Sequence, residues 1–145
     1  MQLRKKLVLL ESLRLQSIFV HLIDGRGSRK IYRLSDDERE WVEIGELPEQ
    51  RIYFGITSLN GRIYITGGVN GGALRSCLCF DPSAPVDSRI SPIVDMGYAR
   101  YQHSLIVANR KLYAIGGFQE VHENFCNSIE KYDPQTNEWR GVGNF

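Results

Sequence analysis

Arg62-Ile63-Tyr64-Ile65-Thr66-Gly67-Gly68 and Lys111-Leu112-Tyr113-Ala114-Ile115-Gly116-Gly117 are two stretches of the same design, and they decide the fold. Each is a short apolar strand that ends at a glycine pair, and the two pairs are 49 residues apart. Trp41 and Trp139 are separated by twice that spacing. A fixed period of about 50 residues indicates a repeat architecture, in which each repeat is one supersecondary unit that stacks on its neighbours.

The same order of signals surrounds each glycine pair. Arg51 and Arg100 stand 16 residues before the pairs, and each opens an apolar run. Asn60-Gly61 and Asn109-Arg110 separate this run from the glycine strand. Asn-Gly between two apolar runs predicts a hairpin, because a type I′ turn needs positive φ at both central residues. A third strand follows and ends at an Asp-Pro dipeptide in both units.

Short strands with frequent turn signals predict an all-β fold, and four strands per repeat predict the blades of a β-propeller. A third set of signals comes earlier: residues 30–35 match the third strand and residues 40–44 the fourth, but no glycine pair precedes them. We therefore expect a leader, a partial or degenerate blade and two complete blades. Their residue ranges are 1–16, 17–50, 51–99 and 100–145.

Taken together, these residues resemble the kelch repeat. The motifs are the arginine, Tyr-x-x-Gly-Gly, Tyr-Asp-Pro and the tryptophan; unit 100–145 carries all of them, and unit 51–99 lacks only the tryptophan. An irregular stretch, residues 83–91, stands near the missing tryptophan. The resemblance covers residues 17–145 and implies kelch-type propeller blades. The residues predicted to have structural roles in the repeat are Tyr64, Gly67, Gly68, Tyr113, Gly116, Gly117, Tyr132, Trp41 and Trp139.

The length of the chain limits how many blades it can hold. A propeller has about 4–8 blades, and six blades of the kelch period need roughly 290 residues. The 145 residues hold two recognisable blades and part of a third, so we expect an incomplete ring. An open stack of blades leaves an apolar face at each end. Two hypotheses follow: the chain is part of a longer product, which we favour, or copies associate to complete the ring.

Composition excludes several classes of protein. With 18 Lys and Arg against 17 Asp and Glu, the formal charge is +1, which gives no basic surface for nucleic acid. No apolar run reaches the ~18–20 residues of a membrane span. The apolar run at residues 7–10 is too short for a secretory signal peptide. Leu3, Leu7 and Leu10 fall at helical spacing, which predicts a short helix in the leader.

The cysteines and histidines give no sign of a catalytic or metal site. An odd number of cysteines, Cys77, Cys79 and Cys126, indicates a reducing compartment, so we expect the cytoplasm, with Cys126 as the most reactive thiol. The three histidines stand in three different units and have no metal-ligand spacing. Some kelch-like propellers are copper oxidases with tyrosine and histidine ligands, but the second histidine is missing here. We predict a protein without enzymatic activity and without a cofactor.

Binding residues are expected in the loops that follow the glycine pairs, because loops on a rigid scaffold carry function. Arginine recognises carboxylates with two parallel hydrogen bonds, and Arg and Tyr are frequent at the centres of interfaces. This predicts an acidic or polar partner segment, although Arg51 and Arg100 could equally make structural hydrogen bonds within a blade. The predicted contact residues are Arg51, Tyr53, Asn70, Arg75, Arg100, Tyr101, Gln119, His122 and Asn124.

The kelch resemblance implies a protein-interaction module that binds other proteins through the propeller loops. Many kelch-like proteins carry BTB and BACK domains before the propeller and select substrates for cullin-RING ubiquitin ligases. The leader is too short for either domain, so this chain could not recruit a cullin by itself. The alternative that the resemblance leaves open is a kelch protein that binds actin or the cytoskeleton. A catalytic propeller is the least favoured hypothesis.

Overall fold

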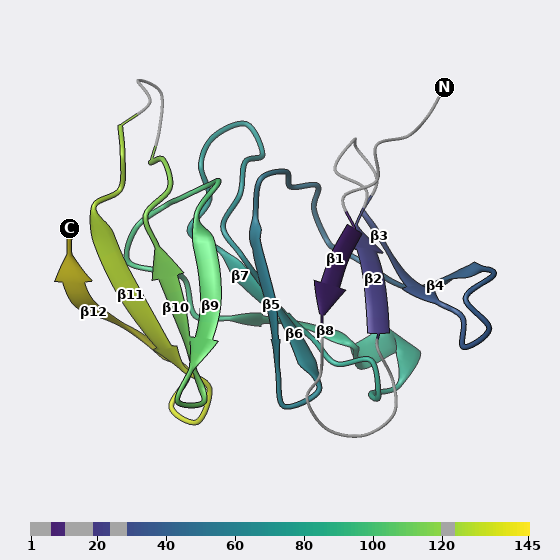
Figure 1. Ribbon diagram of the computed structural model, residues 1–145. Helices are drawn as coiled ribbons and strands as arrows, with labels where there is room; N and C mark the ends of the chain where they lie inside the picture. Colours follow the sequence, from purple (N-terminus) through teal and green to yellow (C-terminus); the bar gives the residue numbers. More distant parts are fainter. Residues whose placement is uncertain (1–6, 11–18, 24–28, 120–123) are drawn as a thin grey trace.

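The computed structural model describes residues 7–10, 19–23, 29–119 and 124–145. Within them, twelve strands form three antiparallel four-stranded sheets, and the strands of each sheet follow one another in chain order (Figure 1). We call these sheets the first, second and third blade. The first blade comprises β1 (Leu7–Leu10), β2 (Phe19–Ile23), β3 (Lys30–Leu34) and β4 (Trp41–Glu46).

The second and third blades correspond to the two repeats seen in the sequence. The second consists of β5 (Gly55–Leu59), β6 (Arg62–Thr66), β7 (Cys77–Phe80) and β8 (Ile90–Ile93), with a 3₁₀ turn, η1 (Val86–Ser88), between β7 and β8. The third consists of β9 (Ser104–Ala108), β10 (Lys111–Ile115), β11 (Ser128–Asp133) and β12 (Glu138–Asn144). The all-β prediction is confirmed.

The hairpin turns have the predicted conformation. Asn60 and Gly61 have φ angles of 52° and 75°, and Asn109 and Arg110 have φ angles of 49° and 60°. Positive φ at both central residues is the type I′ geometry, whose twist matches that of the strands it joins. The paired strands accordingly stay in register from the turn to the glycine pair.

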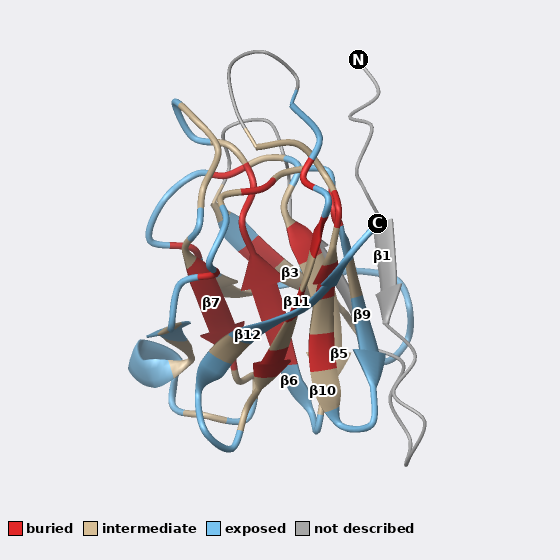
Figure 2. Cartoon of the chain, turned by 90° about the vertical axis from the view of Figure 1, so that its left-hand side faces the viewer, coloured by how far each residue is buried: buried red, intermediate tan, exposed pale blue. Residues whose placement is uncertain are grey.

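The hydrophobic core lies between the blades. Ile31 of the first blade packs with Ile63 and Phe80 of the second, and Tyr64 of the second packs with Leu112 and Tyr132 of the third. Figure 2 shows the buried residues concentrated in the inner strands of the stack, with exposed residues in the turns and loops. Because each blade buries its side chains against the next, the packing is that of a stacked repeat.

At the glycine pairs, the backbone of an entry loop passes close to the end of a glycine strand. Gly67 has φ of 58° and Gly117 of 86°, and a Cβ on Gly67 would overlap the carbonyl oxygen of Arg100. A Cβ on Gly117 would lie 2.6 Å from the carbonyl oxygen of Tyr101. Only glycine combines this conformation with such a close backbone approach.

The N-terminal region differs from the sequence prediction. The short helix predicted in the leader is wrong for residues 7–10, which form β1 and pair with β2 from Leu7↔Leu22 to Leu10↔Phe19. Antiparallel pairing supplies backbone hydrogen bonds that outweigh the weak helical spacing of the leucines. The first blade therefore has four strands and extends back beyond residue 17. The other residues of the predicted helix lie outside the described part of the chain.

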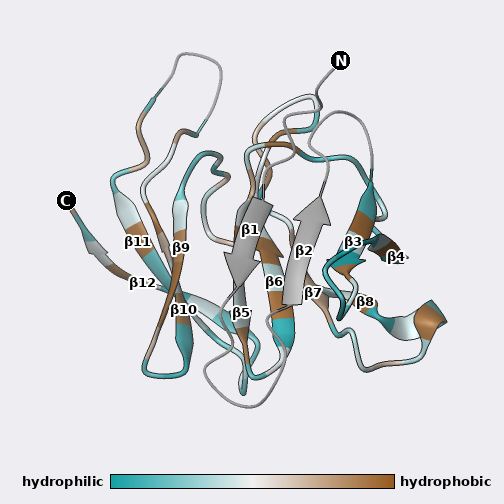
Figure 3. Cartoon of the chain, turned by 45° about the vertical axis from the view of Figure 1, so that its right-hand side comes forward, coloured by the Kyte–Doolittle hydropathy of each residue, from teal (hydrophilic) through white to brown (hydrophobic). Residues whose placement is uncertain are grey.

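The three blades do not close into a ring. The outward face of the third blade carries exposed apolar side chains, including Ile106 and Val142. Figure 3 shows hydrophobic residues along β9, an edge strand of this sheet. The predicted incomplete ring is confirmed. Among the described residues, we find no helix of the length and hydrophobicity that a bilayer crossing demands.

Candidate functional site

Loops gather at one end of the stack of blades. Residues 67–76 join β6 to β7, the described residues 116–119 and 124–127 lie between β10 and β11, and segments 47–54 and 94–103 lead into β5 and β9. We call this end the loop face and the opposite one the turn end. In Figure 1 the loops lie at the top, and the β5–β6 and β9–β10 hairpin turns lie at the bottom. The loops are coupled in pairs, because Ile52 bridges Val69 and Tyr101 bridges Phe118.

Arg51 and Arg100 lie beneath the loop face rather than on it. Arg51 Nη1 donates to the carbonyl oxygens of Gly67 at 3.0 Å and Ser76 at 2.9 Å, and Nη2 donates to Ser76 Oγ at 3.1 Å. Arg100 repeats this pattern with Gly116 at 3.0 Å, Ser128 O at 3.1 Å and Ser128 Oγ at 2.7 Å. Both side chains are buried. Their predicted role as partner contacts is wrong, because the guanidinium groups satisfy carbonyl groups at the strand ends.

Arg100 has an additional buried partner that Arg51 lacks. Its Nη2 lies 2.7 Å from Glu130 Oε2, and the same carboxylate accepts the backbone N–H groups of Gly97 at 2.5 Å and Tyr98 at 3.3 Å. Leu78 of the second blade occupies the position of Glu130 in the repeat. The ion pair ties the entry loop of the third blade to β11.

The other predicted contact residues divide into two groups. Tyr53, Asn70, Arg75 and Asn124 are exposed, whereas Tyr101 and Gln119 are half-buried. Arg75 is held in place because its Nε donates to the carbonyl oxygen of Met96 at 2.9 Å. His122 and the neighbouring Glu120 and Glu123 lie outside the described residues.

Four aromatic rings form a continuous row across the loop face. The ring centroids of Tyr53 and Tyr101 are 6.5 Å apart, those of Tyr101 and Phe118 are 5.5 Å apart and stacked, and those of Phe118 and Phe125 are 5.0 Å apart. These distances are typical of attractive ring pairs. The two ends of the row are exposed, Tyr53 to 51% and Phe125 to 72%. We call these four residues the aromatic row.

Phe118 and Phe125 were not predicted from the sequence. Phe118 stands 49 residues after Val69 and Tyr101 stands 49 residues after Ile52, so aromatic residues replace aliphatic ones in the third blade. This difference between the repeats was the available signal. Phe125 is brought to Phe118 by a bridge across the loop, and Gln119 N donates to Asn124 O at 2.9 Å at its base.

The charges exposed on the loop face do not favour an acidic partner. The two buried arginines contribute none of their charge to a surface contact, and the exposed charged side chains described there are Glu49, Asp95 and Arg75. The expectation of an acidic partner segment therefore loses its basis in Arg51 and Arg100. Exposed aromatic area, not positive charge, distinguishes this face.

His103 joins the second and third blades. It is buried, and its Nε2 lies 2.7 Å from Thr66 Oγ1. Burial, with a smaller contribution from the Arg100 charge, lowers the pKa of His103 to about 4, so the ring is neutral at physiological pH. Within the described residues, no three side chains of His, Cys, Asp or Glu gather in a way that could hold a metal ion.

The three cysteines are free and buried. Cys126, which is expected from the sequence to be the most reactive thiol, is also buried, with its Sγ 3.1 Å from Ser128 Oγ beneath the loop, and its reactivity relative to the other two stays a prediction. Burial raises the pKa of Cys77 to about 12. Thiolate chemistry is therefore suppressed at a position next to the buried arginine.

Known proteins similar to this chain share its repeats. The model of the Kelch motif matches residues 50–84 and 99–145. Kelch-like protein 15 of Danio rerio is 34% identical over 143 residues, covering 83% of this chain and 24% of that protein. Kelch repeat and BTB domain-containing protein 13 of Homo sapiens is 30% identical over 122 residues, covering 80% of this chain and 25% of that protein. The chain thus spans about a quarter of the length of these relatives.

Solved structures share the arrangement of the blades at low sequence identity. YjhT has a TM-score of 0.76 at 15% identity, covering 90% of this chain and 50% of that chain. A fungal alcohol oxidase in complex with copper has a TM-score of 0.71 at 15% identity, covering 86% of this chain and 29% of that chain. At this identity the likeness concerns the fold alone. Because the Kelch motif matches more than half of its residues, the chain belongs to the kelch family and forms blades of a kelch-type β-propeller.

Proposed function

We propose that this chain is a non-enzymatic protein-interaction module and that a partner protein binds its loop face. The aromatic row is the observation that supports this proposal. Tyr53 and Phe125 expose their rings on a scaffold whose loops are fixed by backbone bridges. Aromatic side chains held in place before binding supply contact area at low cost in conformational entropy.

The energy available from this surface is sufficient for a specific contact. Each aromatic side chain can bury about 150–250 Å², and apolar area contributes about 25 cal/mol per Å² removed from water. Covering the exposed parts of Tyr53 and Phe125 therefore contributes about 5–8 kcal/mol before the costs of association. This is the range of the few residues that dominate most interfaces.

We further propose that the bound partner is a substrate of a cullin-RING ubiquitin ligase and that the protein acts in the cytoplasm. The kelch-like relatives, one of them named for a BTB domain, support the adaptor role. The three buried free thiols are compatible with a reducing compartment. If the adaptor role is correct, a partner bound by the loop face is ubiquitinated in cells and accumulates when the chain is overproduced as a competitor.

Binding to actin is the alternative that the kelch family brings. A co-sedimentation experiment distinguishes the adaptor role from the actin-binding role, because actin filaments sediment in the ultracentrifuge. Saturable co-sedimentation of the purified chain with filamentous actin favours the cytoskeletal role. If the chain stays in the supernatant at every filament concentration, the adaptor role is favoured.

A pair of substitutions at the two ends of the aromatic row tests the loop-face proposal. Tyr53→Ala with Phe125→Ala removes exposed rings without touching the core, so the fold should persist while the partner is lost. Val86→Ala is the matched control, since Val86 is also exposed and apolar but lies on η1. Quantitative affinity capture should show a protein retained by the wild type and the control but not by the double variant. Equal retention by all three would reject the loop face as the binding surface.

The outward face of the third blade is uncovered, which favours a second contact there with a further blade. Ile106 and Val142 are exposed there, and a propeller blade buries this face against its neighbour. We propose that a longer chain or a second copy supplies that neighbour. Light scattering separates the cases: a discrete dimer supports a second copy, and a soluble monomer at high concentration contradicts it.

A further inference from the structure

Arg89 occupies the place where the kelch repeat departs from its pattern. In the third blade, Trp139 Nε1 donates at 3.0 Å to the carbonyl oxygen of Val94, which directly follows β8 of the preceding blade. In the second blade the tryptophan is replaced by Ile90, and the neighbouring Arg89 donates from Nη1 to Ile44 O of the first blade at 2.7 Å. Both bonds link residues 45 positions apart. An arginine thus makes the inter-blade hydrogen bond that the tryptophan makes elsewhere, and adds a positive charge.

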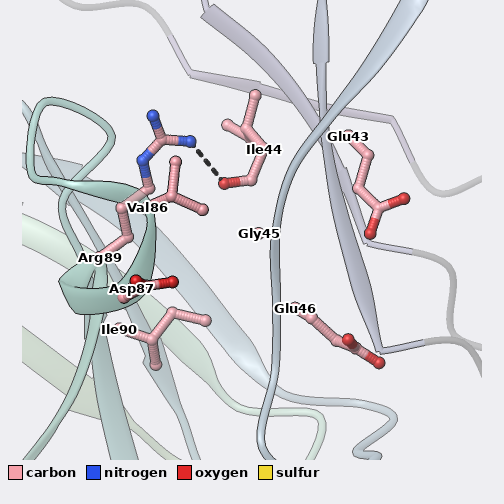
Figure 4. Close-up of a pocket in the computed structure, with 8 residues that line it drawn as sticks. All are labelled: Glu43, Ile44, Gly45, Glu46, Val86, Asp87, Arg89 and Ile90. Atoms are coloured by element: carbon pink, nitrogen blue, oxygen red, sulfur yellow. Dashed lines mark hydrogen bonds between the residues drawn. The ribbon is translucent and has the colours of Figure 1, made fainter.

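The charge of Arg89 is not neutralised by a carboxylate. Its Nε donates to the carbonyl oxygen of Ala84 at 3.1 Å, so both of its recorded hydrogen bonds go to uncharged groups. Among the described residues, none of the ion pairs includes Arg89. Figure 4 shows its guanidinium reaching Ile44 across the gap between the blades.

Arg89 lines a cavity of about 550 Å³ between the first and second blades at the turn end, together with Arg33 of β3 and Arg62 of β6. We call this cavity the three-arginine cleft. The carboxylate of Asp81, which also lines the cleft, accepts hydrogen bonds from Ser83 N at 3.0 Å and Ser83 Oγ at 2.7 Å and lies 3.7 Å from Arg62 Nε. Among the described residues that line the cleft, three guanidinium groups against one carboxylate give a formal charge of +2.

Ion pairs compensate part of this positive charge, and Arg89 is the guanidinium that donates to carbonyl oxygens instead. Arg33 pairs with Asp36 at 2.8 Å, and because that carboxylate is 89% exposed and lies outside the cavity lining, a competing anion displaces it at little cost. A neighbouring cavity, drawn in Figure 4, contains Glu43 and Glu46. These are paired with Lys30 at 3.0 Å and Arg29 at 2.8 Å. Asp87, on the exposed η1, completes the acidic side of that cavity.

The cluster is particular to this cleft and is not required by propeller packing. Strand pairing shows that Leu34, Phe80 and Tyr132 hold equivalent positions in the three blades. Leu34 pairs with Trp41, Phe80 with Ile90 and Tyr132 with Trp139, and these three partners are spaced 49 residues apart. By this alignment, the positions of Arg33, Arg62 and Arg89 are taken in the next cleft by Cys79, Lys111 and Glu138. The second cleft keeps one of the three positive charges and still packs closely. Packing therefore does not explain three arginines at one cavity.

We propose that the three-arginine cleft binds the phosphate group of a phosphorylated serine or threonine on a partner protein. A phosphomonoester carries about −1.5 to −2 charges at neutral pH, which is opposite in sign to the excess positive charge of the cleft. Guanidinium groups donate paired, parallel hydrogen bonds to phosphate oxygens, and the volume is that of a ligand pocket. The site uses residues at the opposite end of the blades from the aromatic row, so it stands independently of the proposed function.

Titration of the isotope-labelled full-length chain by NMR tests this site directly. The probe is a short phosphoserine peptide, compared with its unphosphorylated form, its glutamate form and inorganic phosphate. The phosphopeptide should shift the side-chain resonances of Arg33, Arg62 and Arg89, and the affinity should fall as salt is added. Arg62→Gln should weaken binding about tenfold or more, which corresponds to about 1.4 kcal/mol.

Lys111→Gln is the matched control, because Lys111 holds the position of Arg62 in the third blade and pairs with Asp133 at 3.1 Å. It should leave binding within about twofold. The side chain of Arg62 is 56% exposed, so its variant should fold; Arg33→Gln provides a second variant, and thermal unfolding verifies both. The assignment would be overturned if no resonance shifts at about 10 mM phosphopeptide, or if the glutamate peptide binds equally well. It would also be overturned if inorganic phosphate alone binds, or if Lys111→Gln weakens binding as much as Arg62→Gln.

Discussion

Replacing Arg100 with methionine should destabilise the protein more than any surface substitution. Arg100 is fully buried and joins Gly116, Ser128 and Glu130 through charge-assisted hydrogen bonds. Arg100→Met preserves much of the apolar volume but leaves the carboxylate of Glu130 buried without its cation. Removing one partner of a buried pair costs about 3–5 kcal/mol.

This cost is large compared with the total free energy of unfolding of a typical domain, about 5–15 kcal/mol. Most of it comes from the uncompensated charge rather than from the lost attraction. Substituting Glu130 as well should therefore recover part of the stability. Glu130→Leu introduces the residue that the second blade has at this position, Leu78, which is buried against its neighbours. The double variant should be about 1–2 kcal/mol more stable than Arg100→Met alone.

Urea unfolding followed by tryptophan fluorescence measures all corners of this double-mutant cycle. Arg110→Met is the control, because Arg110 is exposed in a hairpin turn and its loss should change stability by no more than about 0.5 kcal/mol. A loss below about 1 kcal/mol for Arg100→Met, or strictly additive effects of the two substitutions, would refute a buried, coupled ion pair.

Three other outcomes can be measured on the same preparation. The pKa of His103 is lowered to about 4 in the folded chain from an ordinary 6.5. Its contribution to the free energy of unfolding is therefore fully present above pH 6.5 and should fall by up to about 3 kcal/mol as the pH drops to 4. His103→Gln should remove this pH dependence in urea titrations. Cys77, with its pKa raised to about 12, should resist iodoacetamide until the chain unfolds, and rapid labelling of the native protein would contradict its burial. Gly117→Ala should cost at least about 2 kcal/mol in thermal unfolding, because its Cβ would lie 2.6 Å from a carbonyl oxygen, whereas Gly61→Ala, which has positive φ but open space around it, should cost about 1 kcal/mol.

The repeat and its turns were predictable because they depend on local backbone chemistry. The glycine pairs have positive φ, and Asn60-Gly61 forms a turn that requires positive φ. This requirement acts on the backbone of the residue itself, so the sequence records it directly. The period of the repeat then determines the blades.

The roles of the arginines depend on distant residues and were not predictable. Arg51 has the same chemistry whether it binds a partner carboxylate or a carbonyl of its own blade, and only the position of Ser76 shows which is the case. The strand at Leu7–Leu10 was not predicted for the same reason, because pairing with β2 overrides the local helical spacing of its leucines. Long-range pairing of this kind leaves little local signal.

The candidate site contains residues that were predictable from the sequence and residues that were not. Tyr53 and Tyr101 were recognised beside the arginines, but the aromatic row also needs Phe118 and Phe125, which the loop brings together. The departures from the repeat carried the most information: aromatic residues at Tyr101 and Phe118, and an arginine beside the missing tryptophan. We propose that such departures mark binding surfaces, whereas residues shared by the repeats serve packing.

Site-specific photo-crosslinking in cells tests most directly whether a partner binds the loop face. A photoreactive phenylalanine analogue replaces Phe125 on the loop face in one variant and Thr136, exposed in the β11–β12 turn at the opposite end, in another. We predict a defined crosslinked protein from position 125 and none of that protein from position 136. Crosslinking of the same protein from position 136 alone, or equally from both positions, would contradict binding through the aromatic row.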